Sequence, residues 1–407
     1  ELGGFSLGAF RPSPDHSKIA FGVDPVGNER FTLMFRDLTR GEFLADRLTS
    51  CHYSCVWYKD GRQVLYTTVD ANNRPDKVWR HVLGTPQEAD ELLLDEPDPA
   101  VWLTLGSMRT GDYLYVRAAA TTWTEYHLLD AADPCSPPTL VRPRQTGTYY
   151  EIDHRRTSSG DDILYVLHNR NGPNFEVATA EPDRPSDWRT LLPHSEDRRL
   201  HWVMAFAGGV VVYSRTDGRT ELIVLDEDDR PRTIAFDEPG AVVSPASNPH
   251  YDTTEFRYFH TSPVEPQSIR SVDLATGEST TLDRMRVGPA PDGRPYDPGE
   301  YVTYRLWASA EDGTRVPISV VHRKDLPRDG AHPCVLYAYG AYERAADMGF
   351  SSNRLSLLDR GFIYAVAHVR GGGELGKRWH EAGRLASKRN SLTDYVACAE
   401  LLVREGL

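Results

Sequence analysis

The sequence has few cysteines, no long apolar run and no opening methionine. Its five cysteines are an odd number spread over 407 residues, which excludes a disulfide framework and indicates reduced thiols in a cytoplasm. No run approaches the roughly 18 apolar residues of a membrane span, and no charged-then-apolar signal segment opens the chain. We therefore expect a cytoplasmic protein that does not associate with membranes. Because the chain starts at Glu1, we also expect its N-terminus to be incomplete.

Positive charge is also scarce. The chain has 46 Lys and Arg against 59 Asp and Glu, a formal net charge of -13. This balance argues against a nucleic-acid partner and favours basic ligands over acidic ones. Apolar residues make up 40% and charged residues 26% of a chain long enough for two globular domains.

One cysteine cluster resembles half of a metal-binding knuckle. The stretch CHYSC (51–55) offers two thiols and an imidazole, which are the side chains that bind zinc. No second Cys or His pair follows at ligand spacing, so we interpret these as ordinary strand residues. We expect neither a metal nor another cofactor.

The first 280 residues repeat at a period of 45 to 50 residues, each repeat opening with a short strand that ends in an aromatic residue. The six strands end at Phe21, Tyr66, Tyr115, Tyr165, Tyr213 and Tyr258. Repeats of this length, built from short strands and polar turns, are typical of the four-stranded blades of a β-propeller. A β-sandwich is the alternative, but it gives no reason for a regular period. In a propeller these aromatics pack the blades, and the domain acts as a scaffold or gate.

The repeat ends in a Pro/Gly-rich stretch at 287–301, which predicts a linker. We therefore divide the chain into a propeller domain at 1–285 and a second domain at 286–407. The second domain opens with a hairpin around Asp312-Gly313. Two runs that are apolar on both faces, at 334–339 and 362–368, then predict strands of a covered parallel sheet.

Two helices complete the second domain. One is expected at 354–361, closed by a glycine, and the other at 391–405, where Ser391 and Asp394 form a capping box. Hairpin, strand, helix, strand and helix is the opening order of an α/β-hydrolase sheet. The fold predicted is a β-propeller followed by the N-terminal half of an α/β-hydrolase domain.

Two motif matches are misleading. GFSLG (4–8) fits a serine nucleophile elbow, but no helix follows Ser6, so we interpret it as a blade residue. GGGELG (371–376) fits a dinucleotide-binding loop after a strand. It is expected to lead into a charged loop instead of a helix, and Glu374 would place a carboxylate against the phosphates.

The stretch from Tyr337 to Leu407 resembles the prolyl oligopeptidase family of serine peptidases, and within it most the oligopeptidase B group. The motifs are YAYGAY (337–342), SLLDRGF (356–362) and HVRGGGELG (368–376), with VWRH (78–81) and GTP (84–86) in the propeller. The resemblance implies a seven-bladed propeller, of which six repeats are visible. It also implies peptide cleavage in a cavity between the propeller and the hydrolase domain.

The resemblance implies a Ser-His-Asp mechanism whose three residues lie beyond Leu407. The chain alone is then expected to be inactive, with the missing remainder of its polypeptide as its partner. One catalytic residue carries over, Tyr339, whose phenol in this family donates a hydrogen bond to the oxyanion. Without the resemblance, Tyr339 would be interpreted as a core tyrosine.

Four further residues are candidates for substrate binding. By resemblance, Tyr342 matches an aromatic position of the family's substrate pocket, with a packing role as the alternative. Asp347 matches the first of two acidic residues linked in oligopeptidase B to basic side chains, while the second position is Gly349. Arg370 and Glu374 lie in a loop after a sheet strand, where open α/β sheets bind ligands, with a surface ion pair as the alternative.

The function expected is that of a cytoplasmic serine endopeptidase that hydrolyses short peptides after Arg or Lys. A proline-specific oligopeptidase of the same family stays open, because the residues that select the substrate side chain lie mostly downstream. A non-enzymatic propeller scaffold with a degenerate hydrolase domain also stays open. A downstream sequence without a Gly-x-Ser-x-Gly elbow would favour the scaffold.

Overall fold

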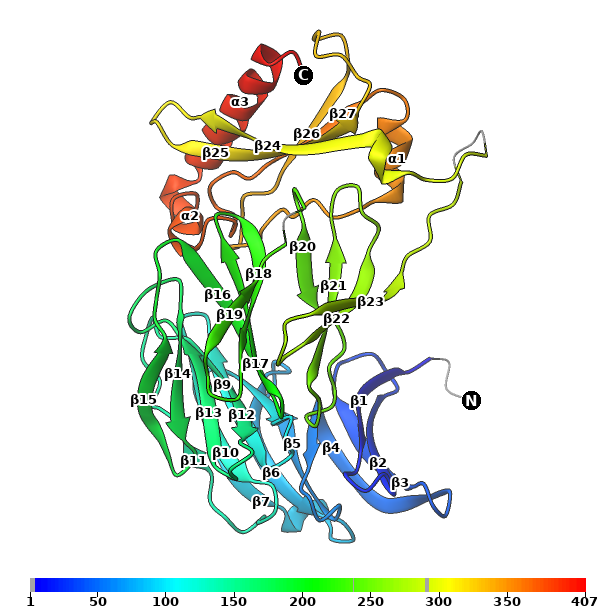
Figure 1. Cartoon of the computed structure of the whole chain (residues 1–407). Coiled ribbons are helices and arrows are strands. Elements are labelled where there is room, and N and C mark those ends of the chain that lie inside the picture. The colour runs from blue at the N-terminus through cyan, green and yellow to red at the C-terminus, as the bar shows by residue number, and fades with distance from the viewer. Residues whose placement is uncertain (1–3, 237, 290–292) are drawn as a thin grey trace. The chain divides into compact units, whose positions relative to one another are not determined.

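The computed structural model describes residues 4–236, 238–289 and 293–407 (Figure 1). The chain separates into two compact units. The first holds residues 1–168 and 178–189, and the second holds residues 169–177 and 190–407. The domain boundary predicted at 285 lies within the second unit, and it stays a prediction.

A long strand, β4, is shared by the first two blades. Its N-terminal half pairs with β3 and its C-terminal half with β5, so seven strands make two four-stranded groups. These strands are β1 (Ser6–Pro12), β2 (Lys18–Asp24), β3 (Phe31–Asp37), β4 (Glu42–Trp57), β5 (Gln63–Val69), β6 (Pro75–Val82) and β7 (Glu91–Asp95). The CHYSC stretch lies in β4, as strand residues.

Four separate four-stranded antiparallel sheets follow. The third blade consists of β8 (Trp102–Ser107), β9 (Tyr113–Ala120), β10 (Trp123–Asp130) and β11 (Thr139–Leu140). The fourth consists of β12 (Tyr150–Arg156), β13 (Asp162–His168), β14 (Glu176–Glu181) and β15 (Arg184–Leu192). The fifth blade consists of β16 (Arg198–Phe206), β17 (Gly209–Thr216), β18 (Arg219–Leu225) and β19 (Pro231–Ile234). The sixth consists of β20 (Val242–Pro245), β21 (Glu255–Thr261), β22 (Ser268–Asp273) and β23 (Ser279–Arg284).

The aromatic-ended strands of the predicted repeat are the second strands of these six blades, namely β2, β5, β9, β13, β17 and β21. The prediction of a propeller built from four-stranded repeats is confirmed. The seventh blade implied by the resemblance stays a prediction, since the described residues contain six such groups.

A mixed sheet follows the blades. Its strands are β24 (Tyr301–Ser309), β25 (Arg315–Arg323), β26 (Cys334–Ala338) and β27 (Ile363–Ala367), in the order β24-β25-β27-β26. β24 and β25 form the predicted antiparallel hairpin, and β26 runs parallel to β27. Among the described residues, β26 is therefore an edge strand.

In the part of the chain that the structure describes, three α-helices accompany this sheet: α1 (Ser352–Leu358), α2 (Lys377–Glu381) and α3 (Arg389–Arg404). Single 3-10 turns are η1 (Gln87–Ala89), η2 (Pro298–Glu300) and η3 (Leu385–Ser387). The predicted capping box is wrong, because α3 begins before Ser391. Both Ser391 and Asp394 instead hydrogen bond to Arg370.

Alternate residues of the central strands lie on opposite faces of the mixed sheet. Ile318 and Val320 of β25 lie in one core with Leu402 of α3. Val321, the next residue along β25, lies in another core with Leu358 of α1. Because strand side chains alternate between faces, runs that are apolar throughout are covered on both sides. The described part of the chain contains no helix long and apolar enough to cross a membrane.

Candidate functional site

The parallel strands β26 and β27 bring two polar residues to the same edge of the sheet, the one formed by the carboxyl ends of these strands. Tyr339 directly follows β26, and His368 directly follows β27. Because neighbouring parallel strands end on the same side, this edge is where open α/β sheets bind ligands. The side chain of Tyr339 is 42% exposed, so a core position does not fit it. Its oxyanion role stays a prediction.

The backbone after β26 enters the left-handed region three times. Gly340, Tyr342 and Glu343 have φ angles of +63°, +54° and +57°. The N–H of Arg344 donates to the carbonyl of Ala341 at 3.0 Å and closes a turn around Tyr342 and Glu343. Positive φ at both central residues is the pattern of a type I′ turn, which favours Asn and Gly. Tyr and Glu at these positions cost about 1 to 2 kcal/mol each.

Tyr342 projects from this turn with 86% of its surface exposed. A packing role was the alternative to a place in the substrate pocket, and such a role requires burial. The exposed ring is free to contact a ligand at the edge of the sheet, but that contact stays a prediction.

Two cations from different elements hold the carboxylate of Glu343. Arg199 of β16 donates from Nη2 to Oε1 at 2.7 Å, and Lys377 of α2 donates from Nζ to Oε2 at 2.6 Å. Burial acts to raise the pKa of Glu343, but Arg199 and Lys377 outweigh it and hold that pKa below its ordinary value. The backbone N–H of Glu343 donates to Nδ1 of His380 at 2.9 Å.

Asp347 pairs with Arg215 of β17. The guanidinium donates from Nη1 to Oδ1 at 2.9 Å and from Nη2 to Oδ2 at 2.7 Å. Burial acts to raise the pKa of Asp347, but Arg215 outweighs it and lowers that pKa. The side chain of Arg215 is 4% exposed and that of Asp347 is 29% exposed. The side chain of Asp347 is thus partly exposed, while Arg215 balances its charge. Its contact with a basic substrate stays a prediction.

Arg370 is buried between two carboxylates. Its Nη2 donates to Asp394 of α3 at 2.6 Å, and its Nη1 donates to Asp312 of the β24–β25 turn at 2.6 Å. The hydrogen bonds to Asp394 raise the pKa of Arg370, and the hydrogen bond from Arg370 lowers the pKa of Asp312 to about 2. The surface ion pair given as the alternative for Arg370 and Glu374 is not what the structure shows, because Arg370 is buried and pairs with Asp394 and Asp312. A contact between Arg370 and substrate stays a prediction.

Glu374 is 3% exposed and folds back over its own loop. Its Oε1 accepts the N–H of Ala346 at 2.8 Å and lies 3.4 Å from Nδ1 of His368. The Nε2 atom of His368 lies in turn 2.7 Å from Oγ of Ser319. These contacts connect the glycine-rich loop to the segment that carries Asp347. A contact between Glu374 and substrate stays a prediction.

The glycines of this loop are required by tight packing. A Cβ atom on Gly371 would lie 2.2 Å from the carbonyl oxygen of Gly340, and one on Gly373 would lie 2.2 Å from that of Glu343. A Cβ on Gly372 would lie 2.1 Å from Oε2 of Glu374. The GGG run thus seats the loop against the turn after Tyr339, which accounts for it without a dinucleotide.

The charged loop predicted after Gly376 is wrong, because the short helix α2 begins at Lys377. Its first N–H donates to Oδ1 of Asn174 at 3.0 Å. The Nδ2 atom of Asn174 donates to the carbonyls of Ser195 and Glu196. A buried side chain from the blades therefore occupies the helix N-terminus where a dinucleotide would place its phosphates.

The blades contribute residues to this region that the sequence alone did not indicate. Arg199 and Arg215 lie in ordinary alternating strands, and Asn174 lies in a loop between strands. Each contacts a residue more than 130 positions away. No local pattern indicates such partners.

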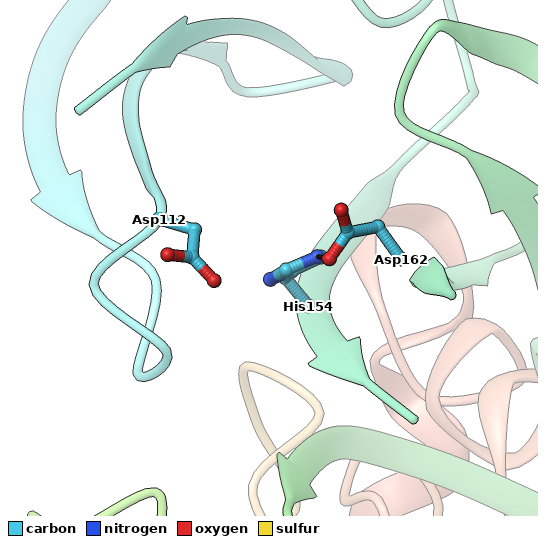
Figure 2. Close-up of side chains that lie close together, drawn as sticks. All are labelled: Asp112, His154 and Asp162. Carbon is cyan, nitrogen blue, oxygen red and sulfur yellow. Dashed lines mark hydrogen bonds and ion pairs between the residues drawn. The ribbon is translucent and has the colours of Figure 1, made fainter. Parts of the chain in front are cut away.

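One group of metal-binding side chain types lies in the first compact unit (Figure 2). Ligand atoms of Asp112, His154 and Asp162 lie within 4.8 Å of one another. Lys59 and Arg156 both form ion pairs with Asp112, and Arg156 also pairs with Asp162. Because two cations already balance the two carboxylates, we interpret this group as an ion-pair cluster.

The blades and the mixed sheet define a β-propeller protein with the start of a second, peptidase-like domain. The chain belongs to the prolyl oligopeptidase family of serine peptidases. The family's N-terminal β-propeller domain matches residues 2–284, and the model described as prolyl oligopeptidase family matches residues 348–407. The resemblance in the motifs is thereby confirmed.

Two curated relatives cover almost all of this chain. Protease 2 of Moraxella lacunata is 32% identical over 97% of this chain and 56% of its own length. Dipeptidyl aminopeptidase BI of Pseudoxanthomonas mexicana is 34% identical over 99% of this chain and 55% of its own length. The chain thus spans about half the length of these relatives.

Two solved structures have the same fold over the chain. Oligopeptidase B from Leishmania major is 31% identical with a TM-score of 0.85, over 100% of this chain and 57% of that one. Oligopeptidase B from Trypanosoma brucei, in a closed form with covalently bound antipain, is 32% identical with a TM-score of 0.84, over 99% of this chain and 57% of that one.

Proposed function

We propose that the full-length protein is a cytoplasmic serine oligopeptidase that hydrolyses short peptides after Arg or Lys. The observation that carries this proposal is the position of Tyr339. Its partly exposed phenol stands where a parallel strand ends, on the ligand-binding edge of the sheet. The protein's membership of the family supports the same conclusion. In this proposal, the catalytic serine, aspartate and histidine belong to the part of the full-length protein that lies beyond Leu407.

In the proposed reaction, a serine attacks the peptide carbonyl while a histidine, oriented by an aspartate, accepts the serine proton. The oxyanion that forms accepts hydrogen bonds from Tyr339 and from a backbone N–H beside the serine. A phenol on the end of a sheet strand suits this role, because it is a neutral donor aimed at developing charge.

The preference for basic side chains is proposed from Asp347 and from the oligopeptidase B relatives. The partly exposed side chain of Asp347 offers a negative charge, but Arg215 balances it, and Gly349 adds no second carboxylate. These two features weaken the basic subsite, and a proline-specific oligopeptidase is the alternative. A prolyl endopeptidase of Elizabethkingia miricola is 28% identical over 95% of this chain.

Reporter peptides distinguish these possibilities in the full-length protein. We expect faster turnover of an arginyl than of a prolyl reporter. Tyr339→Phe is expected to lower kcat about 100- to 1,000-fold with little change in KM. Tyr337→Phe is the matched control, because Tyr337 lies on β26, two residues before Tyr339, and is 47% exposed.

A preference for the prolyl reporter would overturn the basic specificity and support the alternative. Turnover of neither reporter, together with a gene that lacks a Gly-x-Ser-x-Gly elbow, would support the non-enzymatic scaffold. Equal losses in the two tyrosine variants would contradict the role given to Tyr339.

A further inference from the structure

We propose that Arg199, on a propeller strand, is a positioning residue for the peptidase site. Its ion pair with Glu343 holds the turn at Tyr342 and Glu343 in its left-handed conformation and thereby fixes Tyr339. The link to catalysis rests on the proposed function, because it is the oxyanion hydrogen bond of Tyr339 that the turn would serve.

The turn needs such an anchor because its backbone is strained. Tyr342 and Glu343 are consecutive side-chain-bearing residues with positive φ, at positions where Asn and Gly are favoured. Strain of this kind persists only where surrounding contacts over-determine the conformation. The side chain of Tyr342 is almost fully exposed and supplies little of that hold. Side chains hold the turn through Glu343: His380 accepts its backbone N–H, and Arg199 and Lys377 bind its carboxylate.

Arg199 is itself fixed before it reaches Glu343. Its Nη1 donates to the carbonyl of Pro173 at 2.7 Å, and its guanidinium carbon lies 4.2 Å from the ring centre of Phe175. Its side chain is 12% exposed. A guanidinium held by a carbonyl and an aromatic ring loses little freedom on binding a carboxylate, so it makes a rigid partner.

The segment between the turn and Tyr339 has no room to absorb a displacement. A Cβ on Gly340 would lie 2.5 Å from Cγ2 of Val369, and Lys388 donates to the Gly340 carbonyl. Gly373 packs against the carbonyl of Glu343. Glu343 is only four peptide bonds from Tyr339. Because the backbone between them is tightly packed, a shift of Glu343 would displace the phenol of Tyr339 instead of being absorbed locally.

A second ion pair between neighbouring segments provides a matched control. Arg378 of α2 pairs with Glu196, which lies just before β16, at 2.8 Å. Their side chains are 72% and 52% exposed, and the pair joins α2 to the segment before β16 without involving Glu343. Loss of this pair removes a contact between α2 and the segment before β16 but leaves the anchor of the turn in place.

The kinetic experiment uses the full-length protein and an arginyl reporter peptide. Arg199→Met is expected to lower kcat about 10- to 100-fold while KM changes less than about threefold, because the oxyanion donor is displaced but substrate binding is kept. Arg378→Met is expected to change kcat less than about twofold. An equal loss in both variants would overturn the proposal, since the effect would then be a general loosening.

Glycine at position 343 provides the decisive comparison. Glu343→Gly allows positive φ without strain, so it is expected to keep kcat within about fivefold of the wild type. Glu343→Ala loses the ion pairs with both Arg199 and Lys377, so it should lower kcat at least as much as Arg199→Met. Arg199→Met should then cost little in the Glu343→Gly background. If Arg199→Met costs as much in that background as in the wild type, the turn does not depend on the anchor and the proposal fails.

A measurement that is independent of activity separates this proposal from the proposed function. Arg344 is an exposed tryptic site in the turn. We expect Arg199→Met to speed trypsin cleavage after Arg344 about tenfold, and Arg378→Met to leave it unchanged. Unchanged cleavage in Arg199→Met would overturn the anchor. A wild type that hydrolyses no reporter but shows this cleavage pattern would refute the proposed function while supporting the anchored turn.

Discussion

Arg215 forms two hydrogen bonds with the carboxylate of Asp347: Nη1 donates to Oδ1 at 2.9 Å and Nη2 donates to Oδ2 at 2.7 Å. The two residues lie 132 positions apart, on a blade strand and on the segment after β26. The acidic group proposed to attract basic substrates is therefore charge-balanced by the protein itself. Its strength as a binding subsite depends on the propeller as well as on the peptidase domain.

Removal of this arginine is expected to sharpen selectivity for basic substrates. Arg215→Met leaves the partly exposed side chain of Asp347 with an unbalanced charge, so we expect kcat/KM for a diarginyl reporter to rise about fivefold relative to an alanyl-arginyl reporter. The double variant Arg215→Met/Asp347→Asn is the control and should lose the gain. An unchanged ratio in Arg215→Met would show that Asp347 does not face the substrate.

Asp394 is expected to be essential for stability. Asp394→Ala leaves the buried guanidinium of Arg370 without its main partner, which typically costs about 3 to 5 kcal/mol. Asp312→Ala removes the other partner, whose side chain is 50% exposed, and should cost less than about 1 kcal/mol. Chemical denaturation of the full-length protein measures both. Equal losses would mean that burial does not decide the strength of these pairs.

His81 joins two carboxylates in the interior of the first unit. Its Nδ1 lies 2.7 Å from Asp90 and its Nε2 lies 3.1 Å from Asp46, with the imidazole fully buried. We expect His81→Leu to lower the free energy of unfolding by about 3 to 5 kcal/mol, because two buried carboxylates lose their contact with the imidazole. Lys59→Met, which removes an ion pair on a side chain that is 44% exposed, should cost under about 1 kcal/mol. A thermal midpoint of His81→Leu close to that of the wild type would contradict this expectation.

Glu125 is expected to make stability depend on acid pH. Burial acts to raise its pKa, but the neighbouring His127 imidazole and the hydrogen bonds from Arg144 outweigh it and lower the pKa to about 2, from an ordinary 4.5. A lowered pKa contributes stability above the ordinary value, and that stability is lost as pH falls toward 2. Glu125→Gln should therefore cost about 1 to 3 kcal/mol at pH 7.

The test is a series of unfolding measurements of wild type and Glu125→Gln between pH 7 and pH 3. The difference in stability should be constant above about pH 5 and shrink steadily below pH 4.5. A difference that is the same at pH 7 and pH 3 would show that the charge of Glu125 contributes nothing.

The blade repeat and the strands of the mixed sheet could be predicted from the sequence alone. Tyr66 and Tyr165 recur with their strands because each blade is a local unit with its own alternation and turns. The run that became β27 is apolar on both faces because both faces are covered. The similar run of β26 forms an edge strand on which Cys334 and Tyr337 are exposed, so the prediction of a covered strand is wrong there. Patterns of period two and of 45 to 50 residues are properties of neighbouring residues, so the sequence displays them directly.

Only the tertiary structure decided how charged residues are paired. Asp394 has the spacing of a capping box with Ser391, but it serves Arg370, because the close approach of α3 to the glycine-rich loop offers a buried guanidinium as the stronger partner. Arg199 and Glu343 meet across 144 positions. An ion pair between distant segments depends on how blade and sheet pack, so its geometry, and with it the strained turn beside Tyr339, is determined by the fold and is absent from any local pattern.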